Sequence, residues 1–165
     1  MNEPSRILVV RTDRLGDVIL TLPVFNALRR RYPAARLVFL AGRYAGEIAE
    51  GYGPVDEILW YDDAAGPVPF FAMRARLRSA HFDAAVIVHP TLRLALLAFL
   101  SGIPVRVGTG YRYYSLLFNR RVFAHRKTAE RHEAEYNMGL LAPLGCEGAP
   151  VRPLDVPIHI PEDAR

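Results

Sequence analysis

Two short apolar runs constrain the fold of this chain most strongly. Residues 6–11, Arg-Ile-Leu-Val-Val-Arg, and residues 84–88, Ala-Ala-Val-Ile-Val, are rich in β-branched side chains and too short to be helices. A continuous apolar run of this kind is typical of a strand that is buried on both faces, as in a parallel sheet. Each run is followed by a stretch with helical character, so the pattern predicts strand–helix units.

The rest of the chain alternates in the same way. Apolar residues recur at helical spacing from residue 18 to residue 28, and the helix is expected to end near Pro33, since proline cannot continue it. Further strands are expected at 36–40, 57–61 (at a sheet edge) and 105–107, and further helices at 44–50, 70–80, 91–100 and 129–144. Repeated units of this length predict an α/β fold with a doubly wound, Rossmann-like parallel sheet.

Length and composition fit one globular domain. The 165 residues lie within the usual size of about 100–200 residues per domain. Half of them are hydrophobic and 23% are charged, which excludes intrinsic disorder and a fibrous chain. Cys146 is the single cysteine, so a disulfide framework and a zinc site built on cysteines are also excluded. We therefore expect a cytoplasmic protein.

Neither the apolar segments nor the chain start predicts membrane insertion. The longest apolar stretch, residues 94–100, is far shorter than the roughly 20 residues of a membrane-spanning helix. The first eleven residues do not form a signal peptide.

The end of the chain is rich in prolines that show no helical periodicity. They predict a domain over residues 1–148, followed by a proline-rich linker over 149–165 that leads to a second domain absent from this chain.

The basic residues are almost all arginine. The net charge is +4, and of the 21 basic residues only Lys127 is not arginine. Arginine binds phosphate and carboxylate through paired hydrogen bonds, so the imbalance fits an anionic ligand. A compositional bias toward arginine codons explains it equally well. The mild charge, without a nucleic-acid-binding motif, argues against a nucleic-acid partner.

The loops after the two buried strands are the places to look for a ligand, because ligands of open parallel sheets bind beyond the carboxyl ends of the strands. The first loop, residues 12–17, has one glycine, Gly16, so neither the dinucleotide fingerprint G-x-G-x-x-G nor the P-loop is present. A second glycine pattern starts at Gly108 and Gly110 but has Tyr113 where glycine is needed. Binding of NAD or of a nucleotide in a P-loop is therefore not expected.

Asp13 and Asp17 flank the predicted start of the first helix. One interpretation is structural: Asp13 caps the helix and Asp17 stabilises its first turn, an arrangement worth about 1 kcal/mol. The other is functional. Gly16 lets a substrate approach the backbone, while an ionised Asp17 accepts a proton or hydrogen bond from a sugar hydroxyl. A metal site is not expected, because no third ligand lies nearby in sequence and no D-x-D is present.

Three blocks resemble glycosyltransferase family 9, the lipopolysaccharide heptosyltransferases. Residues 11–23, Arg-Thr-Asp-Arg-Leu-Gly-Asp-Val-Ile-Leu-Thr-Leu-Pro, resemble the family's opening [KR]-x-x-x-x-G-D-[VM]. Residues 89–108 are similar to the segment that ends in a-G-i-P-x-R-x-G, most of all in the ADP-heptose:LPS heptosyltransferase II branch. Residues 132–136, His-Glu-Ala-Glu-Tyr, resemble a His-x-x-Glu stretch at the last helix of the family's N-terminal domain. Together the blocks span nearly the whole chain.

The resemblance implies a GT-B glycosyltransferase of two domains, of which this chain is the N-terminal, acceptor-binding half. The absent half would bind the nucleotide-sugar donor, of the ADP-heptose type. By this resemblance Asp17 is the general base of an inverting, metal-independent transfer that needs no cofactor. The acceptor would be an anionic glycolipid or sugar of the lipopolysaccharide-core type. The sequence departs from some members at His89, which stands where they have an acidic or amide residue.

The acceptor-binding candidates follow the strand ends: Thr12, Asp13, Arg14, Gly16, His89, Arg93, Arg112 and Tyr113. Arginines would hold an anionic group of the acceptor, and Tyr113 would stack on a sugar ring. His89 either contacts substrate or is packed and bonded to the backbone.

Other arginines have two interpretations each. Arg120 and Arg121 either contact the acceptor or lie in a solvated turn, and residues 29–31 either touch anionic lipid at the inner membrane or form a solvated helix face. The competing function is a noncatalytic α/β ligand-binding or protein-interaction module. The two functions differ at Asp17, which an enzyme needs in an open cleft and a module needs only as a cap.

Overall fold

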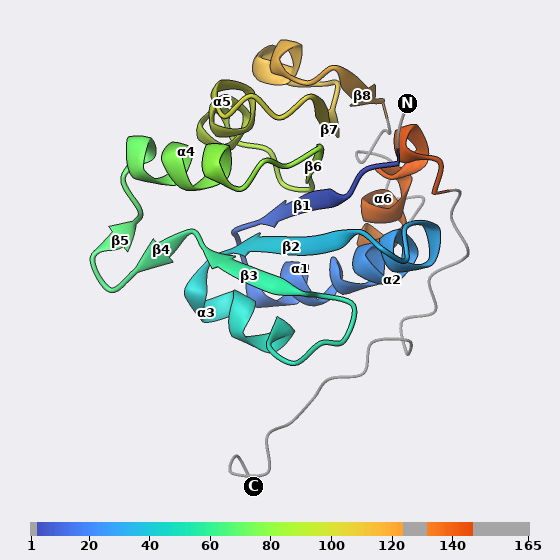
Figure 1. Ribbon diagram of the computed structural model, residues 1–165, viewed down its shortest axis with the longest axis horizontal. Helices are drawn as coiled ribbons and strands as arrows, with labels where there is room; N and C mark the ends of the chain where they lie inside the picture. The colour runs from blue at the N-terminus through green and yellow to red at the C-terminus, as the bar shows by residue number, and fades with distance from the viewer. Residues whose placement is uncertain (1–2, 124–131, 147–165) are drawn as a thin grey trace, which may run out of the picture.

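The computed structural model describes residues 3–123 and 132–146, and its centre is a six-stranded parallel sheet. All five strand pairs are parallel. In spatial order the strands are β3 (Glu57–Trp60), β2 (Arg36–Ala41), β1 (Arg6–Arg11), β6 (Ala84–Ile87), β7 (Val105–Thr109) and β8 (Arg120–Val122). Helices cover both faces (Figure 1), so the predicted doubly wound sheet is confirmed.

The two apolar runs form the central strands, as the sequence predicts. β1 pairs with β6 from Ile7 opposite Ala84 to Val10 opposite Ile87. Alternate side chains of β1 enter different cores: Ile7 lies on one side of the sheet, and Leu8 lies on the other. Burial on both faces is the reason that these strands are apolar at every position.

One face of the sheet is covered by the helices that surround the loop after β1. They are α1 (Leu15–Ile19), α2 (Leu22–Arg31), α3 (Arg43–Gly46) with the 3₁₀ turn η1 (Glu47–Ala49), and α6 (Glu133–Gly139) with the turn η3 (Ala142–Leu144). Phe25 of α2 packs edge-on against Phe39 of β2, with ring centroids 5.1 Å apart.

The opposite face carries α4 (Phe70–Ser79), α5 (Leu92–Leu100) and the 3₁₀ helix η2 (Tyr113–Leu117). α5 ends as predicted, with Gly102 in the left-handed region at φ +78°. At the end of β7, a Cβ on Gly108 would lie 2.6 Å from the ring of Phe118, so only glycine fits beneath that ring.

The helix expected from residue 18 to residue 32 is two helices. Pro23 lacks the N–H that would bond the carbonyl of Ile19, and its ring crowds that carbonyl. α1 therefore ends at Ile19, and α2 begins at Leu22 with Thr21 as its N-cap. The break also frees the Leu20 carbonyl, which accepts a hydrogen bond of 3.0 Å from Asn137 of α6. The interruption therefore ties α6 to the loop region after β1.

Three other features differ from the expectations. Arg120 and Arg121 lie in the edge strand β8, not in a solvated turn, although their side chains are exposed. An antiparallel hairpin of β4 (Asp62–Asp63) and β5 (Gly66–Pro67) precedes α4 and was not predicted. The last helix starts at Glu133, behind its N-cap His132. Residues 129–131 and the predicted linker 149–165 lie outside the described residues.

Candidate functional site

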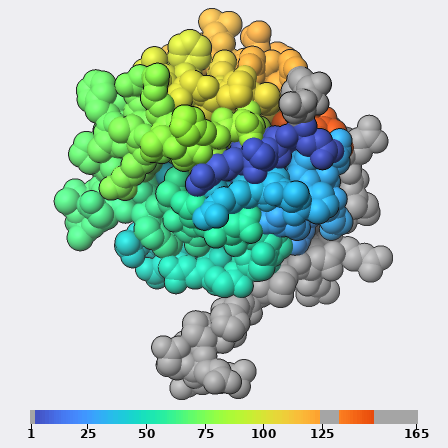
Figure 2. Space-filling view, viewed as in Figure 1, coloured from blue at the N-terminus to red at the C-terminus, as the bar shows by residue number. Residues whose placement is uncertain are grey.

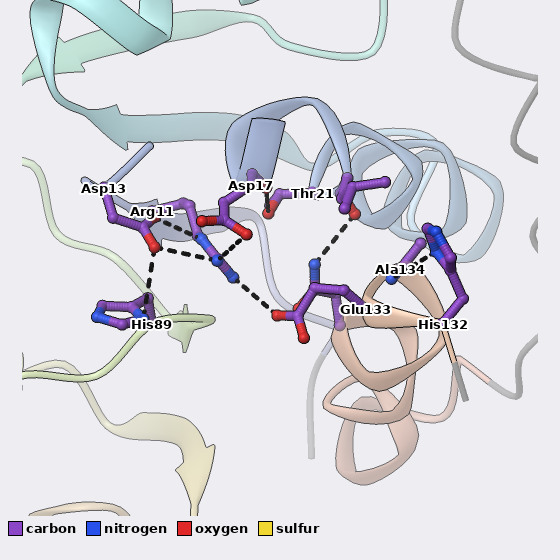
Figure 3. A network of polar contacts seen from close by, with 10 residues as sticks. Arg11, Asp13, Asp17, Thr21, His89, His132, Glu133 and Ala134 are labelled. Atoms are coloured by element: carbon purple, nitrogen blue, oxygen red, sulfur yellow. Dashed lines mark hydrogen bonds and ion pairs between the residues drawn. The ribbon is translucent and has the colours of Figure 1, made fainter. Parts of the chain in front are cut away.

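Predicted site residues from separate loops meet at the carboxyl edge of the sheet (Figure 3). Arg11 is the last residue of β1, and the loop after it carries Asp13 and leads into α1 with Asp17. The pairing with β6 continues beyond Ile87, since the Val88 N–H donates to Val10 O over 3.0 Å. This brings His89 beside the loop that follows β1.

The Arg11 guanidinium is the centre of the site. Its side chain is only 3% exposed, and its Nε and Nη2 donate to both carboxylate oxygens of Asp13, at 2.6 and 3.0 Å. Nη2 also lies 3.0 Å from Oδ1 of Asp17, and Nη1 lies 3.3 Å from Oε1 of Glu133. We call Asp13, Asp17 and Glu133 around Arg11 the carboxylate cluster. One cation faces three carboxylates, so the cluster is formally negative.

Asp17 has one carboxylate oxygen bound and the other open. Its Oδ1 is held by Arg11, and none of the described residues bonds Oδ2. The side chain is 31% exposed, and its residue lies in the first turn of α1, where the Thr21 hydroxyl donates to the Asp17 carbonyl over 2.9 Å. Asp17 is thus oriented and reachable, as a general base must be.

Neither aspartate caps α1. The N-cap residue is Arg14, and no side chain caps the helix. The interpretation of Asp13 as a helix cap is therefore wrong, because Arg11 takes both of its carboxylate oxygens. Asp17 does lie in the first turn, where the helix dipole favours a negative charge.

His89 points toward the carboxylate cluster. Its Nδ1 lies 3.5 Å from Oδ2 of Asp13, and its side chain is 46% exposed. The alternative in which His89 packs inward and bonds the backbone is therefore not what the structure shows. An exposed imidazole beside a carboxylate is able to donate to, or accept from, a ligand hydroxyl.

Arg11 and Glu133 were not among the predicted site residues. Glu133 stands at the start of α6, where the His132 N–H donates to Glu135 Oε2 and the His132 Nδ1 accepts from the Ala134 N–H. The His and Glu of the third block thus cap the helix, while Glu133 between them supplies the carboxylate. One signal for Arg11 was available in the sequence: it is a charged residue at the end of an apolar strand. A buried charge of this kind needs partners of opposite sign.

Three other predicted residues lie next to the carboxylate cluster in sequence. Thr12, Arg14 and Gly16 belong to the same loop and helix start as Asp13 and Asp17. A Cβ on Gly16 would meet nothing within 4 Å, so the space above this glycine is open.

Arg93, Arg112 and Tyr113 are not joined to the carboxylate cluster by any contact within the described residues. Arg112 and Tyr113 are exposed at the loop after β7, where the Arg112 N–H donates to Ser115 Oγ over 3.1 Å. The Arg93 guanidinium donates to the Val68 carbonyl and lies over the ring of Tyr61, with 5.5 Å from its Cζ to the ring centroid. Arg93 is therefore directed toward the segment before α4.

The Arg11 guanidinium lies between the carboxylates of Asp13, Asp17 and Glu133. In residues 3–123 and 132–146, no group of three or more His, Cys, Asp or Glu side chains is arranged to hold a metal ion.

A pocket of about 590 Å³ lies at the opposite, amino edge of the sheet, where Arg31, Asp83 and Arg120 line it. It contains Arg120, one of the two interpretations of which was an acceptor contact, but none of the site residues predicted at the carboxyl edge.

Comparisons with known proteins give relatives of one kind. A Haemophilus influenzae protein named "Putative glycosyltransferase" is 28% identical over 137 residues, which are 83% of this chain and 40% of that protein. Lipopolysaccharide heptosyltransferase 2 of Escherichia coli is 27% identical over 121 residues, 71% of this chain and 35% of the relative. No family model matches the chain.

Solved structures agree on the fold. A glycosyltransferase of family 9 from Veillonella parvula superimposes with a TM-score of 0.79 at 24% identity, over 96% of this chain and 46% of that one. ADP-heptose LPS heptosyltransferase II of E. coli gives a TM-score of 0.76 at 21% identity, over 96% and 47% of the two chains. The curated relatives are thus glycosyltransferases, and the solved structures share the fold of this chain. The chain spans about two fifths of the curated relatives and about half of the solved structures.

The three blocks that carry the family 9 resemblance meet in the structure. Arg11, Asp13 and Asp17 come from the first block, His89 begins the second, and Glu133 lies in the third. Segments that lie more than a hundred residues apart in this chain therefore supply one polar site (Figure 3). Among the described residues, no helix has the length and apolar character needed to cross a bilayer.

Proposed function

We propose that this chain is the N-terminal, acceptor-binding half of a GT-B glycosyltransferase. The whole protein would transfer heptose, or a related sugar, from an ADP-heptose-type donor to an acceptor of the lipopolysaccharide-core type. The homologues support sugar transfer, and the share of their length that the chain covers supports one half of a two-domain enzyme. The observation that carries the proposal is Asp17, with Oδ1 bound to Arg11 and Oδ2 open at the meeting point of the three blocks.

The reaction that fits this site is a single displacement. Oδ2 of Asp17 takes the proton of an acceptor hydroxyl, and the hydroxyl oxygen forms a bond to the anomeric carbon of the donor sugar. The bond from that carbon to the diphosphate oxygen breaks, and the nucleoside diphosphate leaves with the bonding electrons. One displacement inverts the anomeric centre. General-base catalysis of this kind typically contributes about 100- to 10,000-fold to the rate.

Arg11 explains how this base is held without a metal ion. The guanidinium lies against one oxygen of Asp17, while its planar fork binds both carboxylate oxygens of Asp13 and is itself held in place. Asp13 and Glu133 share the charge of Arg11, so Asp17 does not face a full countercharge alone. We propose a metal-independent mechanism in which this arrangement positions the base.

The acceptor would lie across the loop after β1. Thr12, Asp13, Arg14 and Gly16 belong to the loop and helix start that carry Asp17, and His89 lies beside Asp13. These five residues would bind the hydroxyls of the acceptor. Arg112 and Tyr113 would contact a more distant, anionic or sugar portion. Arg93 could join them only after releasing the Val68 carbonyl.

The structure gives less support to the alternative function, a noncatalytic ligand-binding or protein-interaction module. A module would need Asp17 only as a helix cap, and α1 has no side-chain cap. A glycolipid acceptor would place the enzyme in the cytoplasm at the inner membrane, and this location is part of the proposal.

A transfer assay that compares the longer protein with the present chain tests the function. The longer protein, mixed with ADP-heptose and a heptose-deficient lipopolysaccharide core, is expected to release ADP and extend the core. The present chain alone should show no transfer, and calorimetry should show little or no binding of ADP-heptose. Micromolar binding of ADP-heptose by this chain would contradict the proposed division of labour, and no transfer by the longer protein would contradict the activity.

A further inference from the structure

The outward side of α5 is apolar, which is unusual for a helix at a protein surface. Leu94, Ala95, Leu97 and Ala98 face the core, as expected. The outward positions are Leu92, Phe99 and Leu100, each between 40% and 46% exposed. Arg93 is the single polar residue of the helix, and it turns away to the Val68 carbonyl.

Neighbouring elements extend this apolar surface. α5 packs against α4 on one side and against η2 on the other, and Figure 2 shows the three elements next to one another across the upper part of the molecule. α4 presents Phe71, which is 78% exposed, and η2 presents Tyr113 and Leu116, at 77% and 79%. We call the exposed apolar residues of α4, α5 and η2 the α5 face.

The charges around the α5 face have one sign. Residues 64–123 contain eight arginines and one acidic residue, Asp83, whereas residues 3–63 contain eight basic and nine acidic residues. Asp83 lies at the amino edge of the sheet, where its carboxylate accepts from the Ser5 hydroxyl and the N–H groups of Ser5 and Arg6. Arg76, Arg78 and Arg112 are exposed, and no carboxylate in the described part of the chain pairs with them.

We propose that the α5 face docks on the surface of an anionic lipid bilayer. Exposed leucine and aromatic side chains would enter the boundary between headgroups and acyl chains, and the surrounding arginines would contact the anionic headgroups. A second copy of the chain fits less well, because two such faces would bring arginines opposite arginines. The proposal does not depend on the transferase reaction, since lipid binding is measured on this chain alone.

The docking surface differs from the one that the sequence suggested. Residues 29–31 lie on α2, on the opposite face of the sheet from α5. Two of these arginines have acidic partners: Arg29 lies 2.6 Å from Asp56, and Arg31 lies 2.9 Å from Glu3. These ion pairs leave α2 less suited to binding anionic headgroups than α4.

Vesicle co-sedimentation tests the proposal. The chain is mixed with vesicles of phosphatidylcholine alone, or with vesicles in which about a third of the lipid is phosphatidylglycerol. We expect it to pellet with the anionic vesicles and to stay in the supernatant with the neutral ones, and we expect high salt to weaken the binding. Failure to pellet with anionic vesicles would overturn the proposal.

Matched variants locate the surface. Phe71→Ser with Leu116→Ser should abolish most of the binding, while Tyr44→Ser, which removes an 82% exposed ring on the other side of the sheet, should leave it unchanged. Arg78→Glu should weaken binding about fivefold or more, since a basic residue near an anionic membrane is worth about 1 kcal/mol. Arg30→Glu is its control, because both arginines are exposed in the last turn of a helix.

Two results would contradict the location. Equal losses in Arg78→Glu and Arg30→Glu would show that net charge alone drives binding. A dimer in size-exclusion chromatography that Phe71→Ser with Leu116→Ser converts to monomer would show that the α5 face is covered by a second copy instead. Circular dichroism of each variant confirms that the fold is retained.

Discussion

Nη2 of Arg11 lies 3.0 Å from Oδ1 of Asp17, so a buried cation at the end of the central strand fixes a partly exposed carboxylate. The same guanidinium reaches Asp13 in the loop and Glu133 on α6. One arginine thus orients the proposed base and joins two helices to the sheet. Its position explains why the site is assembled from segments far apart in sequence.

Asp17→Asn should separate catalysis from folding. The amide oxygen can still lie against the Arg11 guanidinium, but the amide cannot take a proton from the acceptor. In the longer protein we expect kcat to fall about 100- to 10,000-fold. The free energy of unfolding of this chain should change by no more than about 1 kcal/mol. Near-normal kcat would show that Asp17 is not the base.

Asp13→Asn should have the opposite balance. Asp13 accepts two hydrogen bonds from Arg11, and an amide can accept only one of them. We expect activity to be largely retained and the free energy of unfolding to fall by about 1 kcal/mol. Steady-state kinetics and urea denaturation of the two variants side by side measure the contrast. A larger loss of kcat in Asp13→Asn than in Asp17→Asn would reverse the assignment.

Arg11→Met should destabilise the chain, because it leaves three carboxylates without their shared cation. Removing one partner of a fully buried pair costs about 3–5 kcal/mol. Here the carboxylates are between 22% and 31% exposed and can turn to water, so we expect a smaller loss of about 2–3 kcal/mol. Arg14→Met removes an exposed arginine three residues later and should change stability by less than about 0.5 kcal/mol. Equal unfolding midpoints for the two variants in urea would contradict the role of Arg11.

The central part of the fold is predictable because burial on both faces leaves an unambiguous apolar run, as in β1 and β6. β8 is not predictable in the same way. Its residues Arg120 and Arg121 are exposed, and the strand exists because β7 offers a free edge next to it. The hairpin of β4 and β5 has two residues per strand, which is too short to show a period. The interruption at Pro23 had a local signal, since proline stands inside the helical pattern.

The candidate site is predictable where it follows strand ends. Asp13, Asp17 and His89 could be found because the carboxyl ends of parallel strands meet at one edge. The ion pair of Arg11 and Glu133 joins residues 122 positions apart, and no local spacing connects them. The direction of Arg93 was equally hidden, because it depends on the Val68 carbonyl in the segment before α4. Pairings of this kind are properties of the folded chain.

Stability at low pH should depend on Asp83. Partial burial alone would raise its pKa, but hydrogen bonds from the Ser5 hydroxyl and from the N–H groups of Arg6 and Ser5 hold the pKa below its ordinary value. The folded state therefore favours the ionised carboxylate. Its contribution is fully present above the unfolded pKa of about 4 and is lost as pH falls through the lower, folded pKa.

Urea denaturation of Asp83→Asn at several pH values measures this contribution. At neutral pH we expect the variant to be about 1 kcal/mol less stable than the native chain, a modest value because the carboxylate is partly exposed. The difference should shrink as pH falls below about 4 and vanish once pH is below the folded pKa. Glu50→Gln, an exposed position, is the control and should show no such dependence. A difference that persists unchanged into acid would mean that ionisation of Asp83 does not matter.

Gly16→Ala should make the fold more stable and the enzyme slower. Gly16 lies within α1, has no positive φ, and has nothing within 4 Å of the place where a Cβ would stand. Alanine in such a helical position gains about 0.4–1 kcal/mol over glycine. If the acceptor approaches the backbone beside Asp17, the added methyl group enters the space that it needs. We therefore expect this chain to have a higher melting temperature. In the longer protein, we expect the KM for the acceptor to rise at least several-fold.

Gly53→Ala is the control. It also adds a methyl group into open space, but it lies far along the chain from the carboxylate cluster and should leave the kinetics unchanged. A stabilised Gly16→Ala enzyme with native KM and kcat would show that the acceptor does not pass over this turn, and the acceptor path would then have to follow His89 instead.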